Sequence, residues 1–261
     1  MKVAVLGAGG RMGSMVCGAV DADRDLELVA AVDPARAADV VPGLSQATLR
    51  YSRDLPDMVA AGATVAVDFT TPEAVRANAR YCAAHGMHLV VGTTGMGEAG
   101  EAELSRLYPK GGPLGCVVAA NFAIGAVLSM RFAEMAAPWF ETVEVIELHH
   151  DGKVDAPSGT ALRTAERIAA ASAEWAPDPT TSETVRGARG GVGPGGIHVH
   201  SVRLRGLVAH QEVLLGTVGE TLTIRHDSID RSSFMPGVVL ALKAVAGLPG
   251  LTVGIDLLLG L

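Results

Sequence analysis

The chain has few cysteines, and none of them stands in a pattern that binds metal or forms disulfides. Cys17, Cys82 and Cys116 lie far apart within apolar segments. This spacing offers neither a disulfide framework nor a zinc site, so we expect buried structural thiols. His198 and His200 share one face of a predicted strand, but no third ligand stands at a recognisable spacing, and no metal site is expected.

The chain also lacks an excess of positive charge and a long apolar run, and we expect no signal peptide because its amino terminus leads directly into a predicted strand. Its formal net charge is −7, with the charges scattered, which disfavours nucleic acid and anionic membrane surfaces as partners and favours a small molecule. Its longest apolar stretch, residues 116–130, is interrupted by Asn121 and is shorter than the ~20 residues of a membrane span. We expect a soluble, cytoplasmic protein whose 261 residues suit one compact unit or two small domains.

A glycine-rich turn follows the first apolar run, residues 2–6, and precedes a helical pattern over 14–21. The spacing is G-x-x-G-x-x-G, because Met12 stands where the strict G-x-G-x-x-G pattern requires glycine. Glycine suits this position because a pyrophosphate must approach the backbone N–H groups at the start of the helix. We therefore expect a dinucleotide-binding turn made of Gly7, Gly10, Arg11, Met12 and Gly13.

A second apolar run, residues 26–32, ends in Asp33, twenty residues after Gly13. An acid at this distance accepts hydrogen bonds from the ribose hydroxyls of a dinucleotide and repels a 2′-phosphate. We therefore expect NADH as the preferred cofactor. NADPH stays open as an alternative, because the guanidinium of Arg11 or Arg36 can pair with a 2′-phosphate.

The first part of the chain alternates strands and helices, which is typical of βαβ units and a parallel sheet. Further strands are predicted at 64–69, 87–91 and 114–119, with helices over 72–85 and 97–108 and a helix-like stretch with turns up to about residue 62. Ligands of such sheets bind at the carboxyl ends of the strands. We therefore expect the cofactor to contact Phe69, Gly92, Thr93, Thr94, Ala119, Ala120, Asn121 and Phe122, with Thr93 and Asn121 nearest the nicotinamide.

The pattern changes to period 2 in the second half of the chain. Helices are predicted over 124–137 and 159–175, strands at 142–148, 197–205, 209–216 and 220–226, a loop over 176–196, then a helix from 232 and a strand at 251–255. The fold class is therefore α/β: a Rossmann-type doubly wound parallel sheet plus a second α+β domain with a mostly antiparallel sheet. We expect residues 1–122 and 231–261 to form a dinucleotide-binding domain, and 123–230 a second domain.

Two histidines and a lysine follow the predicted strand over 142–148. Since His149 and His150 are adjacent, their rings should point in different directions, so that one can act while the other binds. Lys153 adds a fixed positive charge. Structural alternatives stay open at each position, because the histidines can satisfy nearby carbonyls and the lysine can be solvated.

Ser158, Gly159 and Thr160 begin the predicted helix that follows this group. The N–H groups of Gly159 and Thr160, with a hydroxyl on each side, form a site suited to a carboxylate, although Ser158 can also act only as an N-cap. Cationic, proton-donating and anion-binding groups thus converge near a domain boundary. This combination predicts a site for an acidic substrate.

The chain resembles the 4-hydroxy-tetrahydrodipicolinate reductase (dihydrodipicolinate reductase) family of bacterial lysine biosynthesis. The similarity lies in residues 7–13, the Gly-Thr-Thr-Gly turn at 92–95, Ala-Asn-Phe at 120–122 and above all residues 147–161, and it covers essentially the whole chain. The motif His-His-x-x-Lys-x-Asp-Ala-Pro-Ser-Gly-Thr-Ala is specific to that family. Residues 206–212 and 225–227 further resemble actinobacterial members.

The resemblance implies the NAD(P)H-dependent reduction of 4-hydroxy-tetrahydrodipicolinate, a dicarboxylate, in diaminopimelate and lysine biosynthesis. It implies His149 as the proton donor and Lys153 as a second acid or charge. It also implies a homotetramer assembled through the second-domain sheets. One departure is Pro34, because several relatives carry arginine there and that phosphate partner is missing here. The residues implied for binding the substrate are His150, Ser158, Gly159 and Thr160.

Two other kinds of protein share parts of this pattern. A dehydrogenase of a dicarboxylic amino acid, such as an aspartate dehydrogenase, would have a similar first domain but no need of the His-His-x-x-Lys and Pro-Ser-Gly-Thr arrangement. A non-catalytic regulator that senses NADH would normally carry a basic DNA-binding element, which a chain of net charge −7 lacks. Dinucleotide binding without turnover would favour the regulator.

Overall fold

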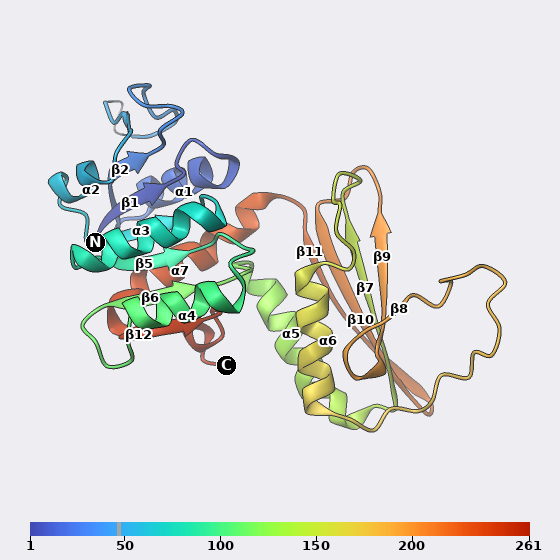
Figure 1. Cartoon of the computed structure of the whole chain (residues 1–261). Coiled ribbons are helices and arrows are strands. Elements are labelled where there is room, and N and C mark those ends of the chain that lie inside the picture. The colour runs from blue at the N-terminus through green and yellow to red at the C-terminus, as the bar shows by residue number, and fades with distance from the viewer. Residues whose placement is uncertain (46–47) are drawn as a thin grey trace. The chain divides into compact units, whose positions relative to one another are not determined.

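The computed structural model describes residues 1–45 and 48–261 and contains two compact units, each with its own sheet (Figure 1). The first unit comprises Met1–Phe122 and Phe234–Leu261, and the second unit comprises Ala123–Ser233. The second unit thus interrupts the first in the sequence. The chain returns to the first unit at Phe234, three residues after the predicted boundary at residue 231. Within the described residues, no helix is both long and apolar enough to cross a membrane.

The sheet of the first unit has seven strands in the order β12-β6-β5-β4-β1-β2-β3, and every neighbouring pair is parallel. After β3 the chain crosses to the other side of β1, so the winding direction reverses between β1 and β4, where α/β sheets bind their ligands. The strands are β1 (Lys2–Leu6), β2 (Glu27–Val32), β3 (Tyr51–Ser52), β4 (Val65–Asp68), β5 (His88–Val91), β6 (Gly115–Val118) and β12 (Gly250–Val253).

Helices cover both faces of this sheet, as a parallel sheet requires. On β1, Ala4 and Leu6 join a core cluster that includes residues of α3 and α4, and the alternate residues Val3 and Val5 are fully buried as well. α1 contacts α7, and α3 contacts α4. The helices are α1 (Arg11–Ala22), α2 (Pro56–Ala60), α3 (Pro72–Ala84), α4 (Gly97–Leu107) and α7 (Met235–Ala244). The expected Rossmann-type architecture is confirmed.

The three cysteines lie in the core of the first unit as free thiols, as expected. Cys17 lies on α1, Cys82 on α3 and Cys116 on β6, and each is fully buried. Burial raises the pKa of Cys17 and of Cys82 to about 12. These thiols therefore stay protonated at neutral pH.

The second unit contains a mixed sheet in the order β11-β10-β7-β9-β8. Only β7 and β9 pair in parallel, with α6 in the connection between them, and the other three pairs are antiparallel. The expected mostly antiparallel sheet is thus confirmed. Its elements are α5 (Ile124–Ala136), β7 (Thr142–His149), α6 (Gly159–Ala171), β8 (Gly191–Val192), β9 (His198–Arg203), β10 (Ala209–Thr217) and β11 (Glu220–Ser228).

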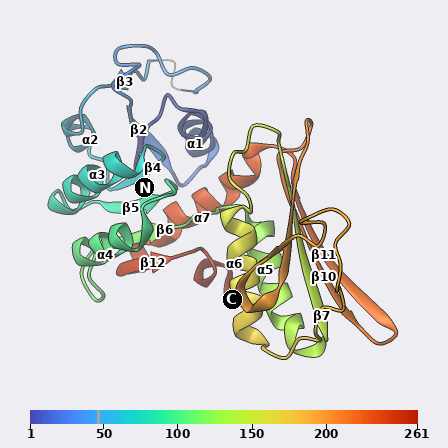
Figure 2. The same cartoon turned by 45° about the vertical axis from the view of Figure 1, so that its right-hand side comes forward.

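α5 and α6 pack against each other and cover one face of this sheet (Figure 2). On β7 the residues that point to these helices are buried, including Val145 and Glu147, whereas Glu144 and Ile146 on the opposite face are partly exposed. Glu147 is thus a charged residue that faces an apolar layer, and α6 supplies part of that layer with Ile168.

Several element boundaries differ from the sequence prediction. β7 extends to His149, and α1 begins at Arg11. α6 ends at Ala171 rather than near Trp175, because the chain becomes extended at Ser172 and Trp175 packs against the core of the second unit. Two strands, β3 and β8, were not predicted, because a strand of two residues carries no periodic signal. β3 pairs with β2, and β8 pairs with β9 inside the predicted loop.

Gly13 generates a prediction about stability, with Gly18 on the same helix as the control. A Cβ on Gly13 would lie 2.0 Å from the carbonyl oxygen of Gly7, whereas a Cβ on the exposed Gly18 would meet no heavy atom of the described residues within 4 Å. We expect Gly13→Ala to lower the free energy of unfolding by about 1–3 kcal/mol. Gly18→Ala should raise it by about 0.5–1 kcal/mol. Urea unfolding followed by circular dichroism tests this, and equal effects would contradict it.

Candidate functional site

The expected cofactor residues of the first unit all lie at the carboxyl edge of its sheet. The five strands that supply them are neighbours, in the order β6-β5-β4-β1-β2. The rings of Phe69 and Phe122, which follow β4 and β6, lie side by side with centroids 6.1 Å apart. Gly92 after β5 lies beneath Phe69, since a Cβ there would come within 2.1 Å of that ring. The strand ends thus form one continuous surface.

The glycine turn brings backbone close to backbone at the start of α1. Gly7 has a positive φ of 73°, and a Cβ there would lie 2.7 Å from the carbonyl oxygen of Phe69. Gly10 is the N-cap of α1 and has no side chain to accept hydrogen bonds from the N–H groups of the first turn. Arg11 is the first residue of this helix. An uncapped helix start beside a basic residue fits the pyrophosphate of a dinucleotide.

Asp33 is held against the glycine turn. One carboxylate oxygen accepts the N–H of Gly9 at 2.8 Å, and the other accepts the N–H of Ala35 at 3.1 Å. Each oxygen keeps a second lone pair, so the half-buried carboxylate can still accept a ribose hydroxyl. Arg36 lies on the same side of the turn, because a Cβ on Gly9 would come 2.7 Å from its Cγ.

A fully buried acid, Asp68, organises the loops that follow β4 and β5, although the sequence analysis did not single it out as a site residue. Its carboxylate accepts hydrogen bonds from the Nδ2 of Asn78 at 2.7 Å and from the Oγ1 of Thr70 at 2.6 Å. The hydroxyl of Thr93 donates to it at 3.3 Å. Burial raises the pKa of Asp68, although these hydrogen bonds oppose the change. Asp68 therefore determines where Thr93 lies.

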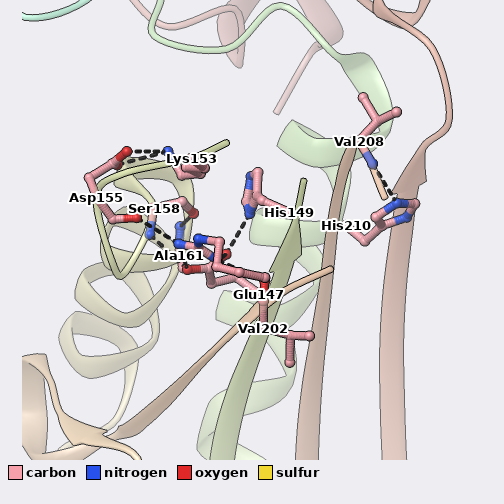
Figure 3. Close-up of polar contacts among 10 residues, drawn as sticks. Glu147, His149, Lys153, Asp155, Ser158, Ala161, Val202, Val208 and His210 are labelled. Atoms are coloured by element: carbon pink, nitrogen blue, oxygen red, sulfur yellow. Dashed lines mark hydrogen bonds and ion pairs between the residues drawn. The ribbon is translucent and has the colours of Figure 1, made fainter. Parts of the chain in front are cut away.

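In the second unit, Glu147 joins the predicted residues His149 and Ser158. The Nδ1 of His149 binds one oxygen of Glu147, and the N–H of Ser158 donates to the other at 3.2 Å. Arg203, at the end of β9, donates to both oxygens at 2.8 and 2.9 Å. The Glu147 side chain is 0% exposed, so this carboxylate is the buried centre of the group (Figure 3).

The charges in this group shift its pKa values in definite directions. Burial acts to raise the pKa of Glu147, but hydrogen bonds led by those from Arg203 outweigh it and leave the pKa below its ordinary value. Burial lowers the pKa of His149, and Glu147 opposes that change only in part. In the free protein, His149 is therefore ready to take up a proton when an anion binds nearby.

Lys153 and the start of α6 lie beside His149 (Figure 3). The Nζ of Lys153 donates to both carboxylate oxygens of Asp155, at 2.7 and 2.8 Å. Ser158 caps α6 by accepting the N–H of Ala161, which places Gly159 and Thr160 in the first turn of a 13-residue helix. The structure thus gathers the predicted residues of 149–160 around one end of β7.

His150 and the other histidines have different surroundings. The ring of His150 lies near Gly152, whose Cβ position is 3.3 Å from its Nδ1. His210 uses both ring nitrogens, since Nδ1 binds Asp227 at 2.6 Å and Nε2 accepts the N–H of Val208 at 3.2 Å. His200 binds Glu144 at 2.6 Å. Among residues 1–45 and 48–261, no group of three or more His, Cys, Asp or Glu could hold a metal ion.

The roles of Glu147, Arg203 and Asp155 were not predicted from the sequence. A signal for Glu147 existed, because it stands two residues before His149 and therefore shares its face of the strand. Arg203 gave no local signal, since its position depends on the parallel register in which it lies opposite His149. Asp155 was quoted only as part of the family motif.

The buried carboxylate of Glu147 generates a prediction about pH. Its pKa in the folded protein lies below the ordinary value of 4.5, so it stabilises the fold above pH 4.5, and this contribution is lost as the pH falls through the lower, folded pKa. We expect Glu147→Gln to lower the free energy of unfolding by about 3–5 kcal/mol at pH 7, because it leaves Arg203 without its partner. The loss should become smaller as the pH falls below 4.5.

Urea unfolding measured at several pH values tests this prediction. Both tryptophans, Trp139 and Trp175, lie in the second unit, so their fluorescence reports on the unit that contains Glu147. Glu101→Gln, at an exposed position on α4, controls for the loss of one negative charge. A deficit for Glu147→Gln that stays constant from pH 7 to pH 3 would contradict the assignment of an ionised carboxylate.

Comparison with known proteins places this geometry in a family. The chain matches the family model "Dihydrodipicolinate reductase, N-terminus" over residues 1–122 and "Dihydrodipicolinate reductase, C-terminus" over residues 125–259. It is 53% identical to the 4-hydroxy-tetrahydrodipicolinate reductase of Cutibacterium acnes, over 100% of this chain and 99% of that protein. The reductase of Nocardia farcinica is 52% identical, over 98% and 97% of the two chains.

A solved structure agrees with both matches. The dipicolinate-bound dihydrodipicolinate reductase of Paenisporosarcina sp. TG-14 is 39% identical and superposes with a TM-score of 0.87, covering 98% of each chain. The models, the relatives and the structure together span both units and include the glycine turn and the His149 group. The resemblance seen in the sequence is therefore confirmed, and the chain belongs to the dihydrodipicolinate reductase family.

Proposed function

We propose that this protein catalyses the NAD(P)H-dependent reduction of 4-hydroxy-tetrahydrodipicolinate to tetrahydrodipicolinate, in diaminopimelate and lysine biosynthesis. The observation that carries the proposal is the group around Glu147, which joins the imidazole of His149 to the start of α6 in a chain that also has a dinucleotide turn. This pairing suits an oxidoreductase with an acidic substrate better than a protein that only binds a nucleotide.

We assign the binding of the two substrate carboxylates to the positive groups around His149. Lys153 and His150 supply cationic or proton-donating side chains. Gly159 and Thr160 lie in the first turn of α6, where the helix dipole favours a negative charge. Lys153 already pairs with Asp155, which is largely exposed. A substrate carboxylate would therefore compete with the carboxylate of Asp155 for the ammonium group of Lys153.

We assign the proton transfer to His149. A nicotinamide held at the first unit would supply the hydride, and the ring would receive it at C4 after the hydroxyl has left as water. Two substrate carboxylates raise the pKa of His149, which burial keeps low in the free protein, so the imidazole becomes charged when the substrate is present. His149 then donates its proton to C3, and Lys153 stabilises the negative charge that builds up on the ring.

We propose NADH as the preferred cofactor, with NADPH as the alternative. The carboxylate of Asp33 repels a 2′-phosphate, and Pro34 supplies no guanidinium in its place. Arg11 and Arg36 are the exposed residues that can pair with that phosphate. The first unit would bind the dinucleotide through the residues that line the carboxyl edge of its sheet.

We further propose that residues 123–230 act as the substrate-binding and oligomerisation domain of a cytoplasmic homotetramer. The sheet of the second unit supports this proposal, because the face opposite α5 and α6 carries partly exposed apolar residues such as Ile146 and Leu148. Sedimentation velocity on the purified protein tests the assembly.

Turnover with freshly generated 4-hydroxy-tetrahydrodipicolinate tests the reaction and the cofactor preference together. We expect rapid loss of nicotinamide absorbance with both cofactors and a higher kcat/KM with NADH. Asp33→Ala should lower that preference, since it removes the charge that repels the 2′-phosphate. Tight NADH binding without turnover would contradict the reaction and favour a regulatory protein that senses NADH.

Replacing the proposed proton donor tests the mechanism. We expect His149→Gln to lower kcat by about 10²–10⁴-fold with a smaller change in KM, which is the usual contribution of a general acid. Lys153→Ala should change both parameters, because its charge acts in the ground state and in the transition state. Steady-state kinetics checks both variants, and an unchanged kcat in His149→Gln would remove His149 from the mechanism.

A further inference from the structure

Every contact to the carboxylate of Glu147 must come from a donor. An ionised carboxylate only accepts hydrogen bonds. Arg203 donates to both oxygens, and the backbone N–H of Ser158 donates to one of them. The contact from the Nδ1 of His149 must then also be an N–H. Within the part of the chain that the structure describes, no hydrogen bond reaches the Nε2 of His149.

Arg203 is the reason that this buried carboxylate stays ionised. Its two-point contact places a positive charge on both oxygens of Glu147, and its Nη2 also donates to the carbonyl of Asp155 at 2.6 Å. Two-point contacts between guanidinium and carboxylate have a fixed direction and are stronger than neutral hydrogen bonds. The position of the Glu147 oxygens therefore depends on β9 as well as on β7.

We propose that Glu147 is a positioning residue that keeps a hydrogen on the Nδ1 of His149 and thereby makes Nε2 the nitrogen that donates to the substrate. The inference rests on the proposed function, in which His149 is the donor. The charged imidazole carries a hydrogen on each nitrogen. Transfer of the Nε2 hydrogen to C3 leaves the neutral ring with its hydrogen on Nδ1, which is the form that Glu147 binds, and Glu147 stays ionised throughout.

Three charged groups determine the protonation of His149. Glu147 on β7 raises its pKa, whereas Lys153 in the following loop and Arg203 on β9 lower it, and burial lowers it most. Asp155 acts through its pair with Lys153. Loss of the Glu147 charge removes the attraction that favours the imidazolium, so His149 should lose its proton at a lower pH.

The variant Glu147→Gln separates positioning from packing, because it keeps the size of the side chain and removes its charge. The amide oxygen is expected on the side where both Ser158 and the Nη2 of Arg203 donate, so the NH₂ group lies on the side of His149 and of the Nη1 of Arg203. Nδ1 then has to accept, and in the neutral ring the hydrogen moves to Nε2. If Glu147 only filled space, the variant Glu147→Gln would leave the tautomer of His149 unchanged.

The first measurement is independent of turnover. Nitrogen-15 spectra of the imidazoles, with the His149 signals assigned by their loss in His149→Gln, report which nitrogen carries the hydrogen. We expect Nδ1–H in the wild-type protein and Nε2–H in Glu147→Gln. The same tautomer in both proteins would overturn the proposal, whatever the substrate of the enzyme is.

The second measurement is the pH dependence of kcat. For Glu147→Gln we expect the limb on which activity falls with rising pH to move down by about one unit or more, and kcat above that limb to fall about tenfold or more, with a much smaller change in KM. Glu144→Gln is the matched control on the same strand. Glu144 also binds an arginine and a histidine, Arg189 and His200, but on the opposite face of the sheet, away from His149.

Two further comparisons keep the test decisive. If Glu147→Gln fails to fold because Arg203 lacks a partner, the double variant Glu147→Gln with Arg203→Gln removes both charges. It should show the same tautomer and a smaller downward shift of the limb, because Arg203 itself lowers the pKa of His149. Equal pH profiles for Glu147→Gln and Glu144→Gln, with activity lost in His149→Gln, would overturn the positioning role and leave the proposed function intact. Full activity in His149→Gln would instead remove His149 from the mechanism, and the absence of turnover by the wild-type protein would overturn the proposed function.

Discussion

The burial of one ionised carboxylate, Glu147, determines how the second unit builds its site. A charge that lies beneath an apolar layer of helices is tolerated only when donors occupy its oxygens. Those donors come from β9, from the start of α6 and from the end of β7. The strand register, the loop that leads into α6 and the ring of His149 are therefore linked by one electrostatic requirement, and none of the three can move alone.

The first unit contains a second buried acid whose surroundings differ in one respect. Asp68 receives its hydrogen bonds from neutral groups, the hydroxyls of Thr70 and Thr93 and the amide of Asn78, and burial raises its pKa. Glu147 faces a guanidinium instead, and its pKa is lowered. A full positive charge outweighs desolvation where neutral donors do not. The two acids both hold loops in place, but of the two only Glu147 is hydrogen-bonded to an imidazole.

The sequence was sufficient for most of the fold and for the local parts of the site. The glycine turn, Asp33 and the strand ends follow from periodicity and spacing, because each is fixed by residues close to it in the chain. Arg203 could not be placed, since its contact with Glu147 crosses 56 positions and depends on a parallel pairing that no local pattern encodes. The two-residue strands β3 and β8 were missed because tertiary pairing alone creates them.

The positions of the cysteines and tryptophans allow the unfolding of the two units to be measured separately. All three cysteines lie in the first unit and both tryptophans in the second. Because the thiols are fully buried and remain protonated, a thiol reagent can react only after α1, α3 or β6 has separated from its neighbours. Labelling rates and tryptophan emission therefore monitor the two halves of one unmodified chain independently, and they reveal which half loosens first.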